Sequence, residues 1–144
     1  MQKTREKEKG FTLVELAVVL VVLGVLAAIA IPNYITMTVR AKESRVKENC
    51  HCVQLAVELY ATGTGGIYPD GTDAAIANDI VPLLPGQQKL KNPFTSNATE
   101  PVVGPAAQAG ETGYEVENVA GVNIGYTITG FGKAQNVISL TTGQ

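Results

Sequence analysis

Residues 10–32 read GFTLVELAVVLVVLGVLAAIAIP and contain the longest apolar run of the chain. From Leu16 to Ile31 it contains no charged or hydrogen-bonding side chain. As a helix this apolar run is about 24 Å long. Counted from Phe11 to Ile35, the helix reaches about 37 Å, which is enough to cross a bilayer core of about 30 Å. The segment therefore predicts one membrane-spanning helix over residues 11–35.

The ten residues before this helix read MQKTREKEKG and carry four basic and two acidic side chains. An ordinary secretory signal has its small-residue cleavage site after the apolar run, and no A-x-A-like site follows here. A cut among the small residues inside the run is the alternative, but the helical pattern continues beyond Pro32. Basic residues before the run predict that this end stays in the cytoplasm and that the rest of the chain faces outward.

Glu15 is the one charged residue between residues 11 and 35. A carboxylate in a membrane-spanning helix costs about 2.5–3.5 kcal/mol on insertion scales. Such a charge is therefore expected to have a partner. The alternative is that Glu15 lies at the headgroup level and reaches water there.

The segment from Gly10 to Leu16 resembles the processing site of type IV prepilins, a family that includes the pseudopilins of type II secretion. In that family a membrane peptidase cuts after the glycine, and the new N-terminal residue is methylated. The resemblance implies a leader over residues 1–10 that ends at Gly10, with Phe11 as the mature N-terminus. It also implies that Glu15 pairs with the free amine of Phe11 on a neighbouring subunit, so that each charge compensates the other away from water.

Pro32 matches a helix-kinking proline of that family, and it would bend or locally melt the helix by removing one backbone hydrogen bond. Gly24 adds flexibility. Apolar residues then recur at spacings of three, four and seven, so the sequence predicts one helix over residues 11–62. The first apolar stripe consists of Val39, Val46, Cys50, Val53, Val57 and Tyr60, and the second of Cys52, Leu55, Ala56 and Leu59. Two stripes fit a helix that packs on its own domain and on neighbouring helices.

Cys50, His51 and Cys52 are consecutive, and consecutive helical side chains point about 100° apart. They cannot converge on one metal ion, and His51 is the only histidine of the chain. We expect two buried thiols, with a disulfide between subunits as the alternative.

Residues 63–144 are expected to form a small globular domain. A glycine-rich segment at residues 63–66 ends the long helix, and Asp73 is expected to cap a short helix that stops at Pro82. Residues 86–112 are rich in Gly, Pro, Asn and Thr and predict an irregular loop. The strand candidates that follow are residues 113–117, 122–129 and 137–141. An antiparallel sheet of about three strands on a long helix is an α+β fold, and it is similar to the pilin fold.

The segment from Leu90 to Phe94 resembles a segment of major pseudopilins whose neighbourhood helps to hold calcium. That resemblance leaves calcium near Asn92 as an alternative, although the carboxylates that calcium prefers are sparse there. The residues by themselves predict no metal and no cofactor.

Composition and motifs exclude several classes of function. With a single histidine in mid-helix and no Gly-rich phosphate loop, the chain is not expected to be an enzyme. After the first ten residues it carries 7 basic and 11 acidic side chains, so no specific nucleic-acid surface is expected.

The predicted function is that of a structural subunit in a type IV pilus or pseudopilus filament. The alternatives are a type II secretion pseudopilin that drives protein export, which residues 92–94 and the lack of a cysteine pair near the C-terminus slightly favour, and a membrane-anchored binding protein that never polymerises. Glu15 argues against the last, because a monomeric anchor has no use for a carboxylate inside the membrane.

The resemblance also implies partners and a location. The expected partners are other copies of the chain, minor pilins, a prepilin peptidase and N-methyltransferase, an assembly platform, and the membrane before assembly. The chain is expected to cross the inner membrane once with its globular domain outside the cytoplasm, and then to enter a pilus or pseudopilus that can reach the cell surface.

Overall fold

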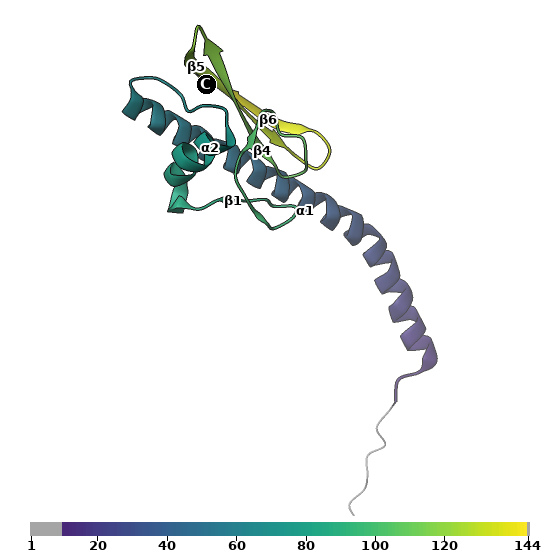
Figure 1. Cartoon of the computed structure of the whole chain (residues 1–144). Coiled ribbons are helices and arrows are strands. Elements are labelled where there is room, and N and C mark those ends of the chain that lie inside the picture. Colours follow the sequence, from purple (N-terminus) through teal and green to yellow (C-terminus); the bar gives the residue numbers. More distant parts are fainter. Residues whose placement is uncertain (1–9, 144) are drawn as a thin grey trace, which may run out of the picture. The chain divides into compact units, whose positions relative to one another are not determined.

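The computed structural model describes residues 10–143, so the expected leader lies outside the described residues except for Gly10. The chain divides into two compact units, Met1–Met37 and Thr38–Gln144. Helix α1 (Leu13–Thr64) belongs to both units, and short helices and strands follow it in the second (Figure 1). The α+β class expected from the sequence is confirmed.

In the first unit, every described side chain from Gly10 to Met37 is exposed. The large apolar side chains project from all sides of the helix, and their exposed fractions range from 47% at Val19 to 86% at Leu13. By length and composition this part of α1 is able to cross a membrane. Its apolar side chains are thus left exposed.

α1 continues without interruption through Gly24 and Pro32. The hydroxyl of Thr36 donates a hydrogen bond of 3.0 Å to the carbonyl oxygen of Pro32. The local melting expected at the proline is therefore not observed, and a bend at Gly24 and Pro32 stays a prediction.

In the second unit, α1 turns the first apolar stripe toward the core. Its central members are fully buried, namely Val46, Cys50, Val53 and Val57. The second stripe is divided, because Ala56 is buried whereas Leu55 and Leu59 are 68% and 55% exposed. One stripe thus packs on the domain of its own chain and most of the other remains accessible.

The helix ends at Thr64, two residues later than expected, and Gly63 belongs to it. Gly65 and Gly66 have positive φ angles, and the amide of Gly66 donates to the carbonyl of Ala61 at 2.8 Å. This bond satisfies a carbonyl of the last helical turn, as glycine after a helix commonly does.

The main sheet has four strands in the order β3-β4-β5-β6. Its members are β3 (Val102–Val103), β4 (Thr112–Val119), β5 (Val122–Phe131) and β6 (Asn136–Thr141). The last three are the predicted strands, and they pair antiparallel as expected. The expectation of three strands was wrong by one, because β3 pairs in parallel with β4.

The expectation of an irregular loop over residues 86–112 was also wrong in part. Besides β3, this region contains β1 (Leu90–Lys91) and β2 (Ala98–Thr99), which form a separate antiparallel pair. Each of these strands has two residues, which is too short for an alternating pattern to be recognised in the sequence.

A short helical segment follows the long helix. Its parts are α2 (Asp73–Ala75), the π-helical turn η1 (Ile76–Ile80) and the 3-10 turns η2 (Val81–Leu83) and η3 (Pro85–Gln87). The cap is Thr72 rather than the expected Asp73, because the hydroxyl of Thr72 accepts a hydrogen bond from the amide of Ala75. Asp73 is instead the first residue of α2, where a carboxylate favours the helix dipole.

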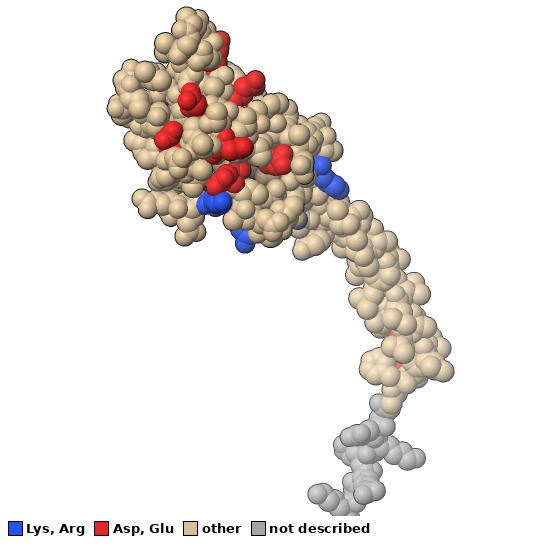
Figure 2. Space-filling view, in the orientation of Figure 1, with Lys and Arg blue, Asp and Glu red and all other residues tan. Residues whose placement is uncertain are grey.

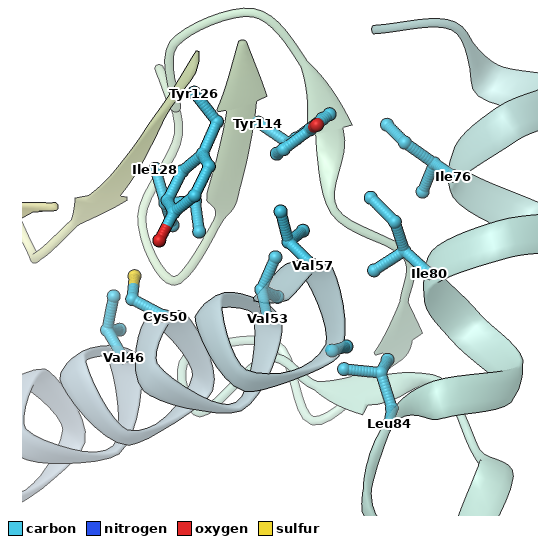
Figure 3. Close-up of a cluster of buried hydrophobic side chains, with 11 residues drawn as sticks. Val46, Cys50, Val53, Val57, Ile76, Ile80, Leu84, Tyr114, Tyr126 and Ile128 are labelled. Carbon is cyan, nitrogen blue, oxygen red and sulfur yellow. The ribbon is translucent and has the colours of Figure 1, made fainter. Parts of the chain in front are cut away.

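The core lies between α1, the sheet and the short helical segment. Figure 3 shows side chains of α1 facing those of β4 and β5, with Ile76, Ile80 and Leu84 closing the other side. The hydroxyl of Tyr114 donates to the carbonyl of Pro69 at 2.8 Å. Among the described residues, no buried side-chain polar atom lacks a hydrogen-bond partner. The second unit, called the globular unit below, therefore satisfies the hydrogen bonds of its own buried side chains.

Candidate functional site

The peptide bond between Gly10 and Phe11 precedes α1 and is accessible. Gly10 is exposed, and Phe11 is 83% exposed. A Cβ atom added at Gly10 would meet no other atom within 4 Å, so no packing within the described chain requires glycine there. Access to the backbone by an external partner is a reason for glycine that does not depend on packing.

Thr12 and Glu15 form a reciprocal cap at the start of α1. The amide and the hydroxyl of Thr12 both donate to Oε2 of Glu15 at 2.9 Å. In return, the amide of Glu15 donates to the hydroxyl oxygen of Thr12 at 3.1 Å. This is a capping box, and it satisfies amides that the first turn would leave without partners.

Thr12 is the residue of this site that our sequence analysis missed. The signal was present, because a threonine followed three residues later by a glutamate before an apolar run indicates a capping box. Oε1 of Glu15 accepts no hydrogen bond from the described residues. One carboxylate oxygen therefore remains available to a partner outside the chain.

The other residues expected to matter lie elsewhere. Gly24 and Pro32 are further along α1, both exposed, and neither contacts Glu15. Phe11 still follows Gly10 in the described chain, so its nitrogen is an amide and not a free amine. The structure brings Phe11, Thr12 and Glu15 together at one helix end, but the expected pair between Glu15 and a neighbouring amine stays a prediction.

The surroundings of Asn92 do not favour calcium. Asn92 is buried, and its Oδ1 accepts hydrogen bonds from the amides of Phe94 and Thr95 at 2.8 and 3.2 Å. Two carboxylates that follow this segment in the chain are also engaged, because Glu111 accepts from two backbone amides and Glu100 pairs with Lys89 at 2.8 Å. Calcium at Asn92 stays a prediction, and these contacts argue against it.

The two cysteines are free thiols on different parts of the surface of α1. Cys50 is buried in the core, and burial raises the pKa of its thiol to about 11. Cys52 is partly exposed, and its pKa is raised by burial and by the nearby charge of Glu48. Within residues 10–143, no three His, Cys, Asp or Glu side chains gather in a way that could hold a metal ion.

These features define a class of proteins with one long N-terminal helix and a small globular domain. The apolar half of the helix is exposed, its first turn is capped by Glu15, and an accessible Gly–Phe bond precedes it. Residues 5–31 match the family model described as the prokaryotic N-terminal methylation motif. No solved structure matches the chain at a significant level.

Several curated relatives extend this similarity. The chain is 46% identical over 54 residues to the type IV major pilin protein PilA of Myxococcus xanthus (38% of this chain, 24% of the relative). It is 38% identical over 61 residues to the type IV narrow pilus major component PilA5 of Thermus thermophilus (42% and 53%). It is 34% identical over 105 residues to the type IV major fimbrial protein FimA of Dichelobacter nodosus (73% and 60%). Each match spans less than two thirds of the relative's length.

By its methylation motif and these relatives, the chain is similar to type IV pilins.

Proposed function

We propose that the protein is a structural subunit of a type IV pilus. It is made as a precursor, cut after Gly10 and methylated at Phe11, and it assembles with other copies through α1. The observation that carries this proposal is the exposed apolar half of α1, whose first turn holds the carboxylate of Glu15. The names of the relatives, which are pilus and fimbrial components, support the same conclusion.

The exposed helix needs an apolar environment. Burial of one Val, Leu or Ile side chain contributes about 1.5–3 kcal/mol, and α1 exposes more than a dozen of them before Met37. The membrane provides that environment before assembly, and the helices of other copies provide it in a filament. A subunit that moves from one to the other keeps its apolar surface covered throughout.

Glu15 gives the assembly its register. Cleavage after Gly10 would turn the nitrogen of Phe11 into a charged amine. A neighbouring Glu15 can pair with that amine through Oε1, which accepts no hydrogen bond within the described chain. An unpaired carboxylate in an apolar surrounding raises the free energy. The favoured alignment of neighbouring subunits is therefore the one in which each Glu15 pairs with an amine.

The remaining partners follow from this route. A prepilin peptidase and N-methyltransferase would process the precursor in the inner membrane, and an assembly platform would move the subunit into the filament together with minor pilins. A pseudopilus of type II secretion is the second candidate, favoured by the segment at residues 92–94. The relatives named above are pilus components, which favours a surface pilus.

Three substitutions separate the charge of Glu15 from its capping role. Glu15→Gln keeps a side chain that can complete a capping box but removes the charge. Thr12→Val keeps the charge and removes the cap hydroxyl. Glu15→Ala removes both. We expect all three proteins to be cut after Gly10, as intact mass spectrometry would show.

Filament yield then tests the proposal. We expect sheared filaments to be lost in Glu15→Ala and Glu15→Gln, and to be reduced only modestly in Thr12→Val. A normal yield from Glu15→Gln would show that the charge does not pair during assembly. Loss of cleavage in Glu15→Ala would instead place Glu15 in recognition by the peptidase.

A further inference from the structure

A cationic cavity lies in the globular unit, where residues 38–45 of α1 face residues 91–96. Its volume is about 280 Å³. Lys42, Arg45 and Lys91 line it, and none of its lining residues is acidic. Since a water molecule occupies about 30 Å³ in the liquid, the cavity can hold a carboxylate group together with several waters.

The cations of the cavity are not neutralised within the described chain. The one ion pair among residues 10–143 joins Lys89 to Glu100, outside the cavity. The ammonium group of Lys42 lies 5.3 Å from the centre of the Phe94 ring, a cation–π contact that leaves its charge in place. Three positive charges without an ion pair therefore face one cavity, which favours an anionic partner.

The wall of the cavity opposite the helix is held by hydrogen bonds. The amide group of Asn49 donates to the carbonyl of Lys91 at 3.2 Å, which ties this segment to α1. The side chain of Asn92 donates to the carbonyl of Ala109 at 3.0 Å, and the amide of Ser96 donates to the Asn92 carbonyl at 2.8 Å. A partner would meet a preformed wall, which lowers the entropy cost of binding.

A second pocket of the globular unit has the opposite charge. Its volume is about 250 Å³, and it is lined by Glu115, Val116, Glu117 and Thr127. Tyr114 is buried in the core against α1, and side chains alternate along a strand, so both glutamates lie on the face of the sheet that points away from α1. Both are exposed, and neither forms an ion pair among residues 10–143.

The acidic pocket belongs to a wider distribution of charge. Residues 49–143 carry eight acidic and three cationic side chains, whereas residues 38–48 carry two and four. Figure 2 shows the acidic side chains gathered over the body of this unit, with lysine and arginine at its border. A long polyanion such as DNA would be repelled by this acidic surface. A single carboxylate side chain could enter the cationic cavity without crossing it.

A second copy of the chain carries the carboxylates that the cavity lacks. The two pockets share no residue, and the acidic one lies on the far side of the sheet from α1. One chain therefore cannot place its own Glu115 and Glu117 in its own cavity, but a neighbouring copy can. A contact between two unlike surfaces can repeat from copy to copy, as a filament requires.

We propose that the cationic cavity of one copy receives Glu115 and Glu117 of a neighbouring copy. The guanidinium group of Arg45 and the ammonium group of Lys91 pair with the two carboxylates, and Lys42 adds a third positive charge. The inference rests on the proposed function and deepens it, because it names a contact between globular units in addition to the packing of α1.

Zero-length cross-linking of the full chain, concentrated in a neutral detergent, tests this contact. Equal amounts of unlabelled and isotope-labelled protein are mixed and treated with a carbodiimide, which joins an amine to a carboxylate in contact with it. We expect a peptide that links Lys91 to Glu115 or Glu117 and carries one label of each kind, as two copies would give. Lys89 and Glu100 are the internal control, because their pair at 2.8 Å should link within one copy.

Charge substitutions then locate the contact. Arg45→Gln should lower the yield of the mixed-label peptide about five-fold, since an exposed ion pair contributes up to about 1 kcal/mol. Lys47→Gln is the matched control, because it removes the same charge from the same helix outside the cavity, and it should leave the yield unchanged. Lys91→Glu should abolish the link, and Lys91→Glu combined with Glu117→Lys should restore it with amine and carboxylate exchanged.

Several results would overturn the contact. If Lys91 gives no mixed-label peptide while Lys89 links to Glu100, neighbouring copies do not meet at these pockets. An equal loss in Lys47→Gln would show diffuse attraction. Loss of the link in inorganic phosphate, but not in sodium chloride of equal ionic strength, would show a site for a free anion. If a variant fails to fold, as judged by circular dichroism, the link in the unchanged protein still decides.

This test is independent of cleavage and of filament formation. Filaments that assemble normally from a protein without the mixed-label link would refute this contact alone. A mixed-label link in a protein that cells never cut at Gly10 would refute the proposed processing and filament role alone.

Discussion

At the scale of single residues, Glu15 can serve two partners in succession. In the described chain its Oε2 accepts hydrogen bonds from the amide and the hydroxyl of Thr12. These bonds cap α1, which begins at Leu13. Cleavage after Gly10 would add a charged amine one residue before Thr12. The same carboxylate can then cap its own helix through one oxygen and pair with a neighbour through the other.

Gly10 is the residue whose role depends most on an external enzyme. Because nothing within 4 Å would touch a Cβ at this position, Gly10→Leu should leave the fold unchanged. We expect it to block cleavage, since the bulky side chain obstructs access to the backbone, and the protein should keep its precursor mass in intact mass spectrometry. Gly24→Ala is the control, because its added Cβ also meets nothing and the cut site is intact. A mature mass from Gly10→Leu would contradict the processing site.

Cys50 predicts a dependence of stability on alkaline pH. Burial raises the pKa of its thiol from about 9 to about 11, so the folded state keeps a proton that the unfolded state loses. The free energy of unfolding should therefore be unaffected by this group below pH 9 and fall between pH 9 and 11. Thermal unfolding in a neutral detergent, followed by circular dichroism, measures this effect.

The tyrosines add to the decline at higher pH. Burial and the hydrogen bond to Glu58 raise the pKa of Tyr126 to about 12, and burial raises that of Tyr114 as well. Cys50→Ala should thus reduce the part of the decline that begins near pH 9, to which Cys52 also contributes, and keep the part that begins near pH 10. An identical pH profile in both proteins would show that the thiol is not protected by the fold.

At the scale of elements, the pairing of α1 with β5 depends on a close approach at Gly130. A Cβ atom there would lie 2.7 Å from Sγ of Cys50 and 2.9 Å from a methyl carbon of Val46. These distances are shorter than van der Waals contact, so the helix and the strand are near each other because this position has no side chain.

Gly130→Ala should therefore destabilise the globular unit by about 1–3 kcal/mol, the usual cost of overpacking a core. Gly63→Ala is the matched control, because it adds the same methyl group within α1 where nothing lies within 4 Å. That change should be neutral or stabilising by up to about 1 kcal/mol, since alanine favours a helix more than glycine does. Unfolding midpoints of the two variants that shift in the same direction would refute this account.

The elements also show what the sequence can and cannot predict. The first stripe of α1 and the strands β4 to β6 have clear periods, and both were predicted. The strand β3 has two residues, and its parallel pairing with β4 is a tertiary contact without a local signal. The Thr72 cap was missed because Asp73 beside it has the higher capping preference, and only the hydrogen bond from the amide of Ala75 identifies Thr72 as the cap.

At the scale of the whole molecule, the apolar part of α1 and the globular unit suit different surroundings. The apolar part of α1 needs lipid or other helices, whereas the globular unit has a satisfied core and an acidic surface. The resemblance at Gly10–Leu16 predicted the similarity to type IV pilins that the methylation motif and the relatives support. The pocket lined by residues from 38–45 and 91–96 was not predictable, because only the tertiary fold brings these two segments together.

In the proposed function, the processed subunit is found in an extracellular filament. Mass spectrometry of the N-terminal peptide in two fractions, sheared surface filaments and the inner membrane, tests it most directly. We expect a peptide that begins with methylated Phe11 to be abundant in the sheared filaments. A methylated peptide confined to the membrane would favour the pseudopilus, and an uncut Met1 end in both fractions would contradict the processing and the assembly proposed from it.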